Sequence, residues 1–135
     1  MDKILWDKTL ETGHARIDAD HRELAQLFNL LREAAEQRKG KEFCSLVLDQ
    51  IIAQARTHFD LEQQMMAKHH YPRIEQHTAE HAMLLEQALG YKAAFDAAEA
   101  DADAGVSLID FPEVWLTFHI LFSDKDLARF LAQLR

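Results

Sequence analysis

The sequence is poor in residues that break helices or cross-link chains. Its 135 residues include four glycines, two prolines and one cysteine, Cys44. A lone cysteine excludes an internal disulfide, so we expect a reducing compartment and interpret Cys44 as a packed, unreactive thiol. The scarcity of glycine and proline, beside abundant alanine, leucine, glutamate and glutamine, favours a compact all-α domain over a sheet protein or a disordered chain.

Long hydrophobic runs and excess positive charge are also missing. No apolar run approaches the ~20 residues that span a bilayer, and the N-terminus lacks the charged-then-apolar pattern of a signal peptide. The net charge of −8 disfavours binding to nucleic acid or to an anionic membrane surface. We therefore expect a soluble, cytoplasmic monomer with no nucleic-acid or membrane partner.

Apolar residues recur every three or four positions and predict four helices of similar length. A non-helical arm over 1–17, broken by Gly13, precedes the first helix, which Asp18 is expected to cap and Gly40 to end. Short connections predict one domain, 1–135, folded as an up-down-up-down antiparallel four-helix bundle. The helices are expected at approximately 18–38, 42–68, 73–98 and 108–134.

The apolar stripes of these helices also predict which residues face the interior. Phe43 and Leu46 fall on the expected inner face of the second helix, and Phe122 on that of the fourth. Histidines 14, 69 and 70 fall in the arm and in the corner before Tyr71-Pro72, and we interpret them as solvated side chains.

Histidines and carboxylates fall in the same stripes as leucine and phenylalanine. Two residues four apart share one helix face, about 40° apart around the axis. A buried imidazole or carboxylate is costly unless it is hydrogen-bonded or coordinated. A hydrogen-bonded core position explains one such histidine, but donors on all four helices favour a dinuclear metal site. The candidate metal ligands are His21, His58, Glu62, His77, His81, His119 and Asp124.

Counting donors sharpens this hypothesis. If Glu62 and Asp124 bridge two ions, the protein supplies five nitrogens and four oxygens. With a solvent-derived bridge, three histidines make one ion six-coordinate, and two leave the other five-coordinate with an open position for a small ligand. Nitrogen and oxygen donors without thiolate suit iron, manganese or zinc, and the sequence leaves that choice open.

Asp124 lies five residues after His119, which is about 140° around an ideal α-helix. The two side chains would not share a face in a regular helix. The helix must therefore widen locally into a π-type turn, as helices often do at functional sites, or the aspartate must reach around it.

The ligand pattern H…HxxxE…HxxxH…HxxxxD, within about this length, resembles that of the hemerythrins, and the chain looks like a single-domain bacterial member from Trp6 to Leu131. Neighbouring motifs match as well: Ile17-Asp18-x-x-His21-x-x-Leu24, His58-Phe59-x-x-Glu62-x-x-Met65, Tyr71-Pro72, and Trp115-x-x-x-His119-Ile120.

The resemblance implies two iron ions with an oxo or hydroxo bridge, reversible dioxygen binding, and binding of azide or similar small anions by the diferric form. It also implies that the protein is not an enzyme. It assigns His77, His81 and His119 to the six-coordinate iron. It assigns His21 and His58 to the iron with the open position, and Glu62 and Asp124 to bridging positions.

An apolar pocket over the open position is expected to exclude water and acids. Ordinary core packing explains each pocket candidate about as well. Two departures from the family pattern, Asp20 for a common glutamine and Gln63 for a frequent glutamate, are expected to alter hydrogen bonds around the ligands. The candidate pocket residues are Leu24, Phe59, Trp115 and Ile120.

Other functions compete for this donor set. Five neutral imidazoles with two carboxylates make a less anionic shell than ferritin-like di-iron sites have, which disfavours splitting of the O–O bond. A ferritin-like oxidase needs two Glu-x-x-His motifs on core helices, and the only match, Glu11-Thr-Gly-His14, lies in the arm. A zinc hydrolase of the HExxH type is excluded because that motif is missing. An oxygen or redox sensor, or a peroxide-handling enzyme, would use the same ligands and stays open.

Overall fold

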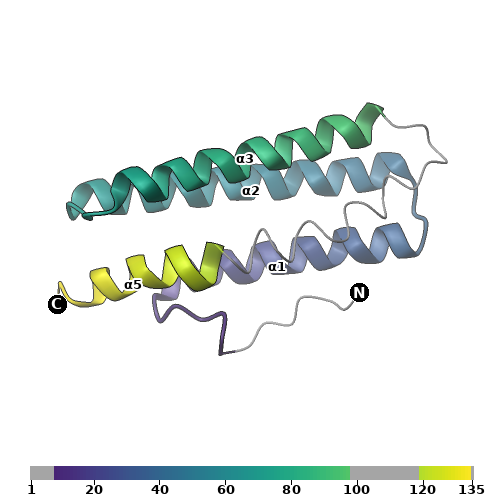
Figure 1. Ribbon diagram of the computed structural model, residues 1–135. Helices are drawn as coiled ribbons and strands as arrows, with labels where there is room; N and C mark the ends of the chain where they lie inside the picture. Colours follow the sequence, from purple (N-terminus) through teal and green to yellow (C-terminus); the bar gives the residue numbers. More distant parts are fainter. Residues whose placement is uncertain (1–7, 98–118, 135) are drawn as a thin grey trace.

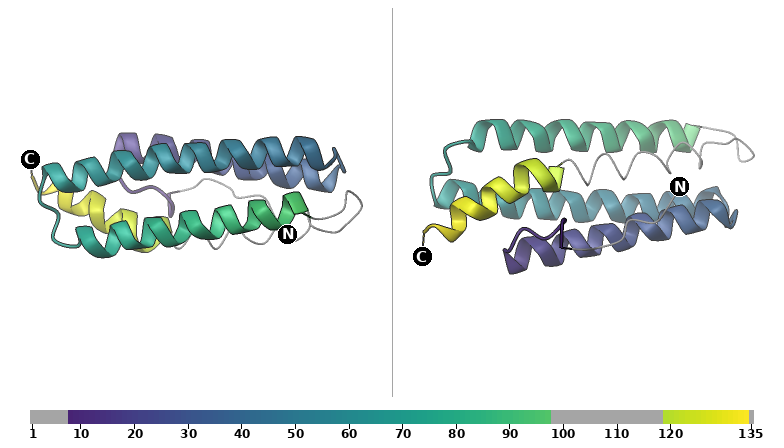
Figure 2. Two further views of the ribbon diagram at one scale, coloured as in Figure 1. Left: turned by 90° about the horizontal axis from the view of Figure 1, so that it is seen from above. Right: turned by 60° about the horizontal axis from the view of Figure 1, so that its bottom comes forward.

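The computed structural model describes residues 8–97 and 119–134, and these residues form helices, turns and short connections without a strand. The chain reverses direction from α1 to α2 and again to α3, and the last segment runs back alongside α1 (Figures 1 and 2). The predicted all-α antiparallel bundle is therefore confirmed. The elements are α1 (Ala15–Glu36), α2 (Lys41–Lys68), α3 (Ile74–Ala97), η1 (His119–Asp124) and α5 (Lys125–Ala132).

Several expectations fall outside the described residues. They concern residues 1–7 of the arm with Trp6, the connection between the third and fourth predicted helices, and the beginning of the fourth helix with Trp115. Among the residues that are described, no helix combines the length and the apolar composition of a membrane-spanning segment.

Two apolar clusters, a larger and a smaller one, hold the bundle together, and the candidate ligands lie between them along the length of the bundle. Burying an aliphatic or aromatic side chain contributes roughly 1.5–3 kcal/mol. In α1, His21 lies between Ile17 of the smaller cluster and Leu24 of the larger; in α2, His58 lies between Ala55 of the larger and Met66 of the smaller. The larger cluster includes Leu24, Phe28, Leu31, Val47, Ile51, Ala55, Leu84, Ala88 and Phe95; the smaller is Ile17, Met66, Tyr71 and Leu127.

Three large side chains expected in the interior are exposed instead. Phe43 is 39% exposed, Leu46 58% and Phe122 68%. In α2 the interior positions belong to Cys44 and Leu48, so this end of the helix is rotated relative to the expected face. Phe122 lies inside η1, where a wider turn changes the rotation per residue. Burial raises the pKa of the Cys44 thiol, in line with an unreactive packed cysteine.

The prediction that Asp18 caps the first helix is wrong. His14 is the N-cap of α1, and its Nδ1 accepts a hydrogen bond from the Ile17 backbone N–H at 3.3 Å, so His14 is not simply a solvated arm residue. The Asp18 carboxylate reaches back into the arm, where it accepts from Thr12 N at 2.8 Å and Gly13 N at 3.1 Å. Gly13 has φ +90°, a conformation that glycine adopts without strain, and this lets the arm fold towards α1.

The end of the first helix also differs from expectation. Arg38, with φ 53°, takes the left-handed position that was assigned to Gly40. The Lys39 N–H closes the helix end by donating to Ala34 O at 3.0 Å. Gly40 is instead the N-cap of α2.

The corner between α2 and α3 is attached to α5. Tyr71 is buried, and its hydroxyl donates to the carboxylate of Asp126, which also pairs with Arg73. His70 is exposed at this corner, as expected for a solvated side chain. Because Asp126 lies two residues after Asp124, this attachment fixes the chain next to a candidate ligand.

Candidate metal centre

All seven candidate ligands gather in one buried cluster within the bundle. They come from α1, α2, α3 and η1, so no single element builds the cluster. None is more than 4% exposed, and both carboxylates are fully buried. The contributions are His21 from α1, His58 and Glu62 from α2, His77 and His81 from α3, and His119 and Asp124 from η1.

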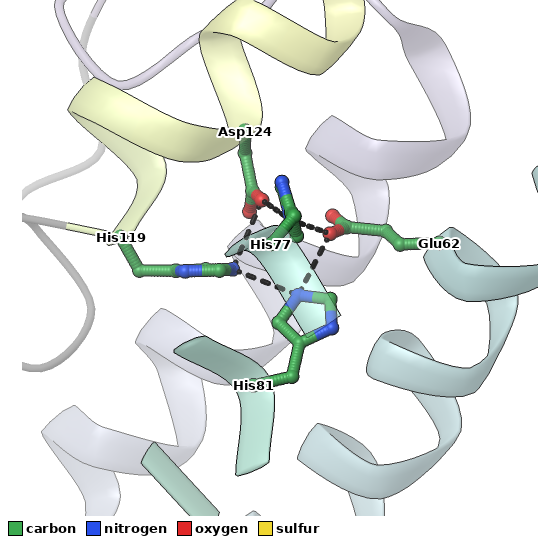
Figure 3. A group of neighbouring side chains, drawn as sticks. All are labelled: Glu62, His77, His81, His119 and Asp124. Atoms are coloured by element: carbon green, nitrogen blue, oxygen red, sulfur yellow. Dashed lines mark hydrogen bonds and ion pairs between the residues drawn. The ribbon is translucent and has the colours of Figure 1, made fainter. Parts of the chain in front are cut away.

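The cluster divides into two groups that share their carboxylates. Within each group, one donor atom from every residue lies within 4.8 Å of the others. Glu62 and Asp124 belong to both groups, which is the arrangement that two neighbouring metal ions with bridging carboxylates require. The first group is Glu62, His77, His81, His119 and Asp124, drawn in Figure 3; the second is His21, His58, Glu62 and Asp124.

Glu62 turns one oxygen towards each group. Its Oε1 lies 2.9 Å from His77 Nε2 and 3.1 Å from His81 Nε2. Its Oε2 lies 2.7 Å from His58 Nε2 and 4.0 Å from His21 Nε2. The carboxylate therefore spans from the α3 histidines to the α1 and α2 histidines.

Asp124 spans the two groups in the same way. Its Oδ1 lies 3.0 Å from His77 Nε2 and 2.9 Å from His119 Nε2. Its Oδ2 lies 2.7 Å from His21 Nε2 and 3.9 Å from His58 Nε2. Together with the Glu62 contacts, these distances show that all five histidines direct Nε2 into the cluster.

The five-residue spacing between His119 and Asp124 is accommodated by a π-helical turn. Residues His119–Asp124 form η1, which settles the choice between a local widening and an aspartate that reaches around a regular helix. The wide turn brings both side chains to the same side, as Figure 3 shows.

The spacing of the donor atoms fits a metal ion. With metal–nitrogen bonds of about 2.1 Å, ligands at right angles lie about 3.0 Å apart. His81 Nε2 and His119 Nε2 are 3.2 Å apart, close to that value. In the described part of the chain, His58 Nε2, Glu62 Oε2 and both Asp124 oxygens have only the ion-pair contacts given above and no hydrogen bond of normal geometry. Buried polar atoms that converge without hydrogen bonds are expected where a cation binds.

Electrostatics in the cluster points the same way. Burial opposes the charged form of the histidines, but contacts with Asp124 and Glu62 outweigh it and raise the pKa of His58 to about 11 and of His77 to about 9. For His119, burial is likewise outweighed, chiefly by the charge of Asp124, and the pKa rises to about 10.

The pKa values of His81 and of the two carboxylates are shifted as well. For His81, burial and the neighbouring histidines outweigh the contact with Glu62 and lower the pKa. Burial and the charge of Asp124 oppose ionisation of Glu62, yet the histidine contacts lower its pKa to about 2. Burial likewise opposes ionisation of Asp124, and the histidines, above all His119, hold its pKa well below the usual value. The cluster thus needs positive charge beside its carboxylates, and a bound metal would replace protons in that role.

Within the described residues, the outward nitrogen, Nδ1, has a hydrogen-bonding partner in three of the histidines. Such partners fix the tautomer and the orientation of a ligand imidazole. Asp20 and Gln63, singled out as departures from the family pattern, are two of these partners; Glu80 was not anticipated, because nothing in its spacing identifies a contact across helices. The pairs are His58 with Asp20 at 3.0 Å, His81 with Gln63 at 3.4 Å, and His119 with Glu80 at 2.7 Å.

Two of the four candidate pocket residues can be placed beside this cluster. Leu24 is 1% exposed and lies one turn after His21 in α1. The Phe59 ring is buried and stacks on His81, with 4.1 Å between ring centroids. Trp115 and the side chain of Ile120 lie outside the described residues. The role of all four in a ligand pocket stays a prediction.

Comparison with known proteins agrees with the geometry. The family model for the hemerythrin HHE cation binding domain matches residues 12–131. The chain belongs to the hemerythrin family. The family and the buried donor cluster together indicate a non-haem metal centre in the bundle.

Relatives from several bacteria are similar over nearly the whole chain. A bacteriohemerythrin from Pseudomonas paraeruginosa is 28% identical over 126 residues, which cover 92% of this chain and 78% of the relative. One from Stenotrophomonas maltophilia is 25% identical, covering 95% and 81%. One from Clostridium acetobutylicum is 25% identical, covering 91% and 97%.

Proposed function

We propose that the protein binds dioxygen reversibly at a di-iron centre with an oxo or hydroxo bridge. One observation carries the proposal: Glu62 and Asp124 each turn one oxygen towards a group of three histidines and the other towards a group of two. This division supplies one iron with a full shell and leaves the other with an open position. The nitrogen and oxygen donors suit iron, and the relatives are named bacteriohemerythrin.

In this proposal the residues hold the irons in unequal environments. His77, His81 and His119 hold the six-coordinate iron, and His21 with His58 hold the other. The irons would supply the two electrons that binding of dioxygen requires. Leu24, which is buried beside His21, keeps water and protons away from the open side, and Phe59 holds the His81 ring by stacking on it.

The remaining properties belong to the same proposal. The protein acts as a carrier, store or delivery protein rather than an enzyme, and its diferric form binds azide at the open position. It works as a monomer in the cytoplasm, where the lone, buried Cys44 stays reduced.

Metal analysis and the visible spectrum test the proposal. Protein expressed with ample iron should contain about two irons per chain. The reduced protein should form a coloured adduct in air that returns to the reduced state when oxygen is stripped, over repeated cycles. One metal per chain, or zinc alone under these conditions, would contradict a di-iron centre; turnover of an organic substrate would point to an enzyme.

A redox or oxygen sensor is the second candidate, and a specific observation favours it. Asp20 and Glu80 place two further carboxylates against ligand histidines, so the surroundings of the cluster are more anionic than its ligands alone. Carboxylates behind imidazole ligands make them stronger donors, which favours the oxidised metal. Rapid conversion to a stable diferric form in air, without a reversible adduct, would support the sensor over the carrier.

A further inference from the structure

Glu80 makes an unusual pair of contacts from the edge of the cluster. It belongs to α3, directly before His81, and its side chain is 31% exposed. Its Oε1 accepts a hydrogen bond from His119 Nδ1 at 2.7 Å, and its Oε2 accepts one from Ser123 Oγ at 2.5 Å. The two oxygens of one carboxylate therefore accept hydrogen bonds from two residues of η1, His119 and Ser123, which are four residues apart.

We propose that Glu80 is a positioning residue of the metal centre, which orients His119 and holds the π-turn that carries Asp124 to its shared position. The inference rests on the proposed metal centre, although it does not depend on which metal is bound or on dioxygen binding. Nothing in the ligand spacing assigns this role, because Glu80 lies on a different helix from the residues that it holds.

The contact with His119 decides which ring nitrogen keeps its proton when a metal binds. A carboxylate oxygen can only accept, so His119 Nδ1 is the donor to Glu80, and Nε2 is the nitrogen left to bind a metal once its own proton is lost. Nε2 lies 2.9 Å from Asp124 Oδ1 and 3.2 Å from His81 Nε2, inside the ligand group. Glu80 thus presents His119 to the cluster in the tautomer and orientation that a metal ligand needs.

The contact with Ser123 acts on the backbone of the same turn. A π-turn is a rare conformation, and it persists where contacts from outside the helix support it. Ser123 directly precedes Asp124, so holding Ser123 and His119 from one carboxylate fixes both ends of η1. The position of Asp124 between the two histidine groups then follows from the fixed turn.

Replacement by glutamine separates geometry from charge. The amide oxygen of a glutamine can accept from His119 Nδ1–H, and its amide nitrogen can donate to Ser123 Oγ, so both contacts survive without the negative charge. Alanine removes both contacts. Glu86, which is exposed on the same helix, provides a matched control for loss of a carboxylate.

The first experiment uses metal-free protein and follows hydrogen exchange of the η1 backbone amides. Loss of the supporting contacts lowers the free energy of local opening. Glu80→Ala and Ser123→Ala should therefore accelerate exchange in 119–124, whereas Glu80→Gln and Glu86→Ala should leave it near the wild-type rate. Exchange in α1 and α2 reports whether each variant is folded. Equal exchange of η1 in Glu80→Ala and Glu86→Ala would overturn the proposal.

The second experiment measures zinc affinity by competition with a chelator, so that no redox activity is needed. Glu80→Ala should lose about 10- to 100-fold in affinity, the usual effect of removing a partner behind a ligand histidine. Glu80→Gln should recover most of that loss. If glutamine is as weak as alanine, charge rather than positioning explains the effect and the proposal fails. If wild-type protein binds no metal pair, it is the proposed function that fails.

Discussion

Binding of metal to the metal-free protein should release protons from the cluster. Contacts with the buried carboxylates raise the pKa of three ligand histidines, His77, His119 and His58, to about 9, about 10 and about 11. We therefore expect all three to be charged at pH 7.5 in the folded, metal-free protein. A metal ion needs the neutral imidazole, so each of them must lose its proton when metal binds.

The expected magnitude follows from these values. Loading at pH 7.5 should release about three protons per chain from the histidines, and one more if a bridging water becomes hydroxide. Glu62 adds none, because its pKa of about 2 means that it is already ionised. Each released proton changes the apparent affinity tenfold per pH unit, so the overall constant should rise about a thousandfold from pH 7 to pH 8.

The same protons affect the stability of the metal-free protein. The histidine pKa values are raised from 6.5 in the unfolded chain, so the folded chain binds more protons above that value. The stabilisation is therefore fully present below pH 6.5 and is lost as the pH rises through about 9 to 11. The free energy of unfolding should fall over this window in metal-free protein, whereas the metal-loaded protein should lack this decline.

Titration with zinc in weakly buffered solution, followed by a pH indicator, measures the release directly. Calorimetry in two buffers of different ionisation enthalpy provides an independent count. His70→Gln, a change at the exposed corner, should leave the count unchanged. Release of fewer than one proton per chain, together with tight zinc binding, would refute the assignment of protons to the cluster.

Two further predictions concern single side chains. Glu62→Gln should lower the metal content more than it lowers the melting temperature, because it removes a bridging charge while keeping the shape of the side chain. Elemental analysis and thermal unfolding of the same sample measure the two effects. Full iron content with an unchanged spectrum would exclude a bridging role. Leu24→Ser should speed oxidation of the oxygen adduct by admitting water and protons, and the decay of the adduct in the visible spectrum measures this. The control is Leu30→Ser, because Leu30 lies on the same helix and is 40% exposed, and it should have little effect. Equal decay in the two variants would exclude Leu24 as a barrier.

Helix periodicity predicted the ligand pairs correctly, although it wrongly placed Phe43 and Leu46 in the interior. A spacing of four places His58 with Glu62 and His77 with His81 on common faces, and the structure brings these pairs together. The odd spacing of His119 and Asp124 was informative as well, because a regular helix could not satisfy it and a π-turn does.

Sequence signals for helix caps, and contacts between helices, were predicted less reliably, because several residues could fill the same position. Asp18 resembles a helix cap in sequence, but its carboxylate accepts hydrogen bonds from the backbone amides of Thr12 and Gly13 in the arm instead. Gly40 resembles a helix end, yet Arg38 takes the left-handed position. Contacts such as Glu80 with Ser123 depend on how α3 and η1 are aligned along the bundle, which no spacing within one helix specifies.

The asymmetry of the proposed centre arises from the number of histidines rather than from charge. The two carboxylates divide their oxygens equally between the groups, and the contacts of the described residues place a further carboxylate behind a histidine of each group, Asp20 behind His58 and Glu80 behind His119. What differs is that α3 and η1 together present three imidazoles, whereas α1 and α2 present two. If the centre holds two irons as proposed, the open position would lie on the side of α1 and α2, where Leu24 is buried one turn after His21.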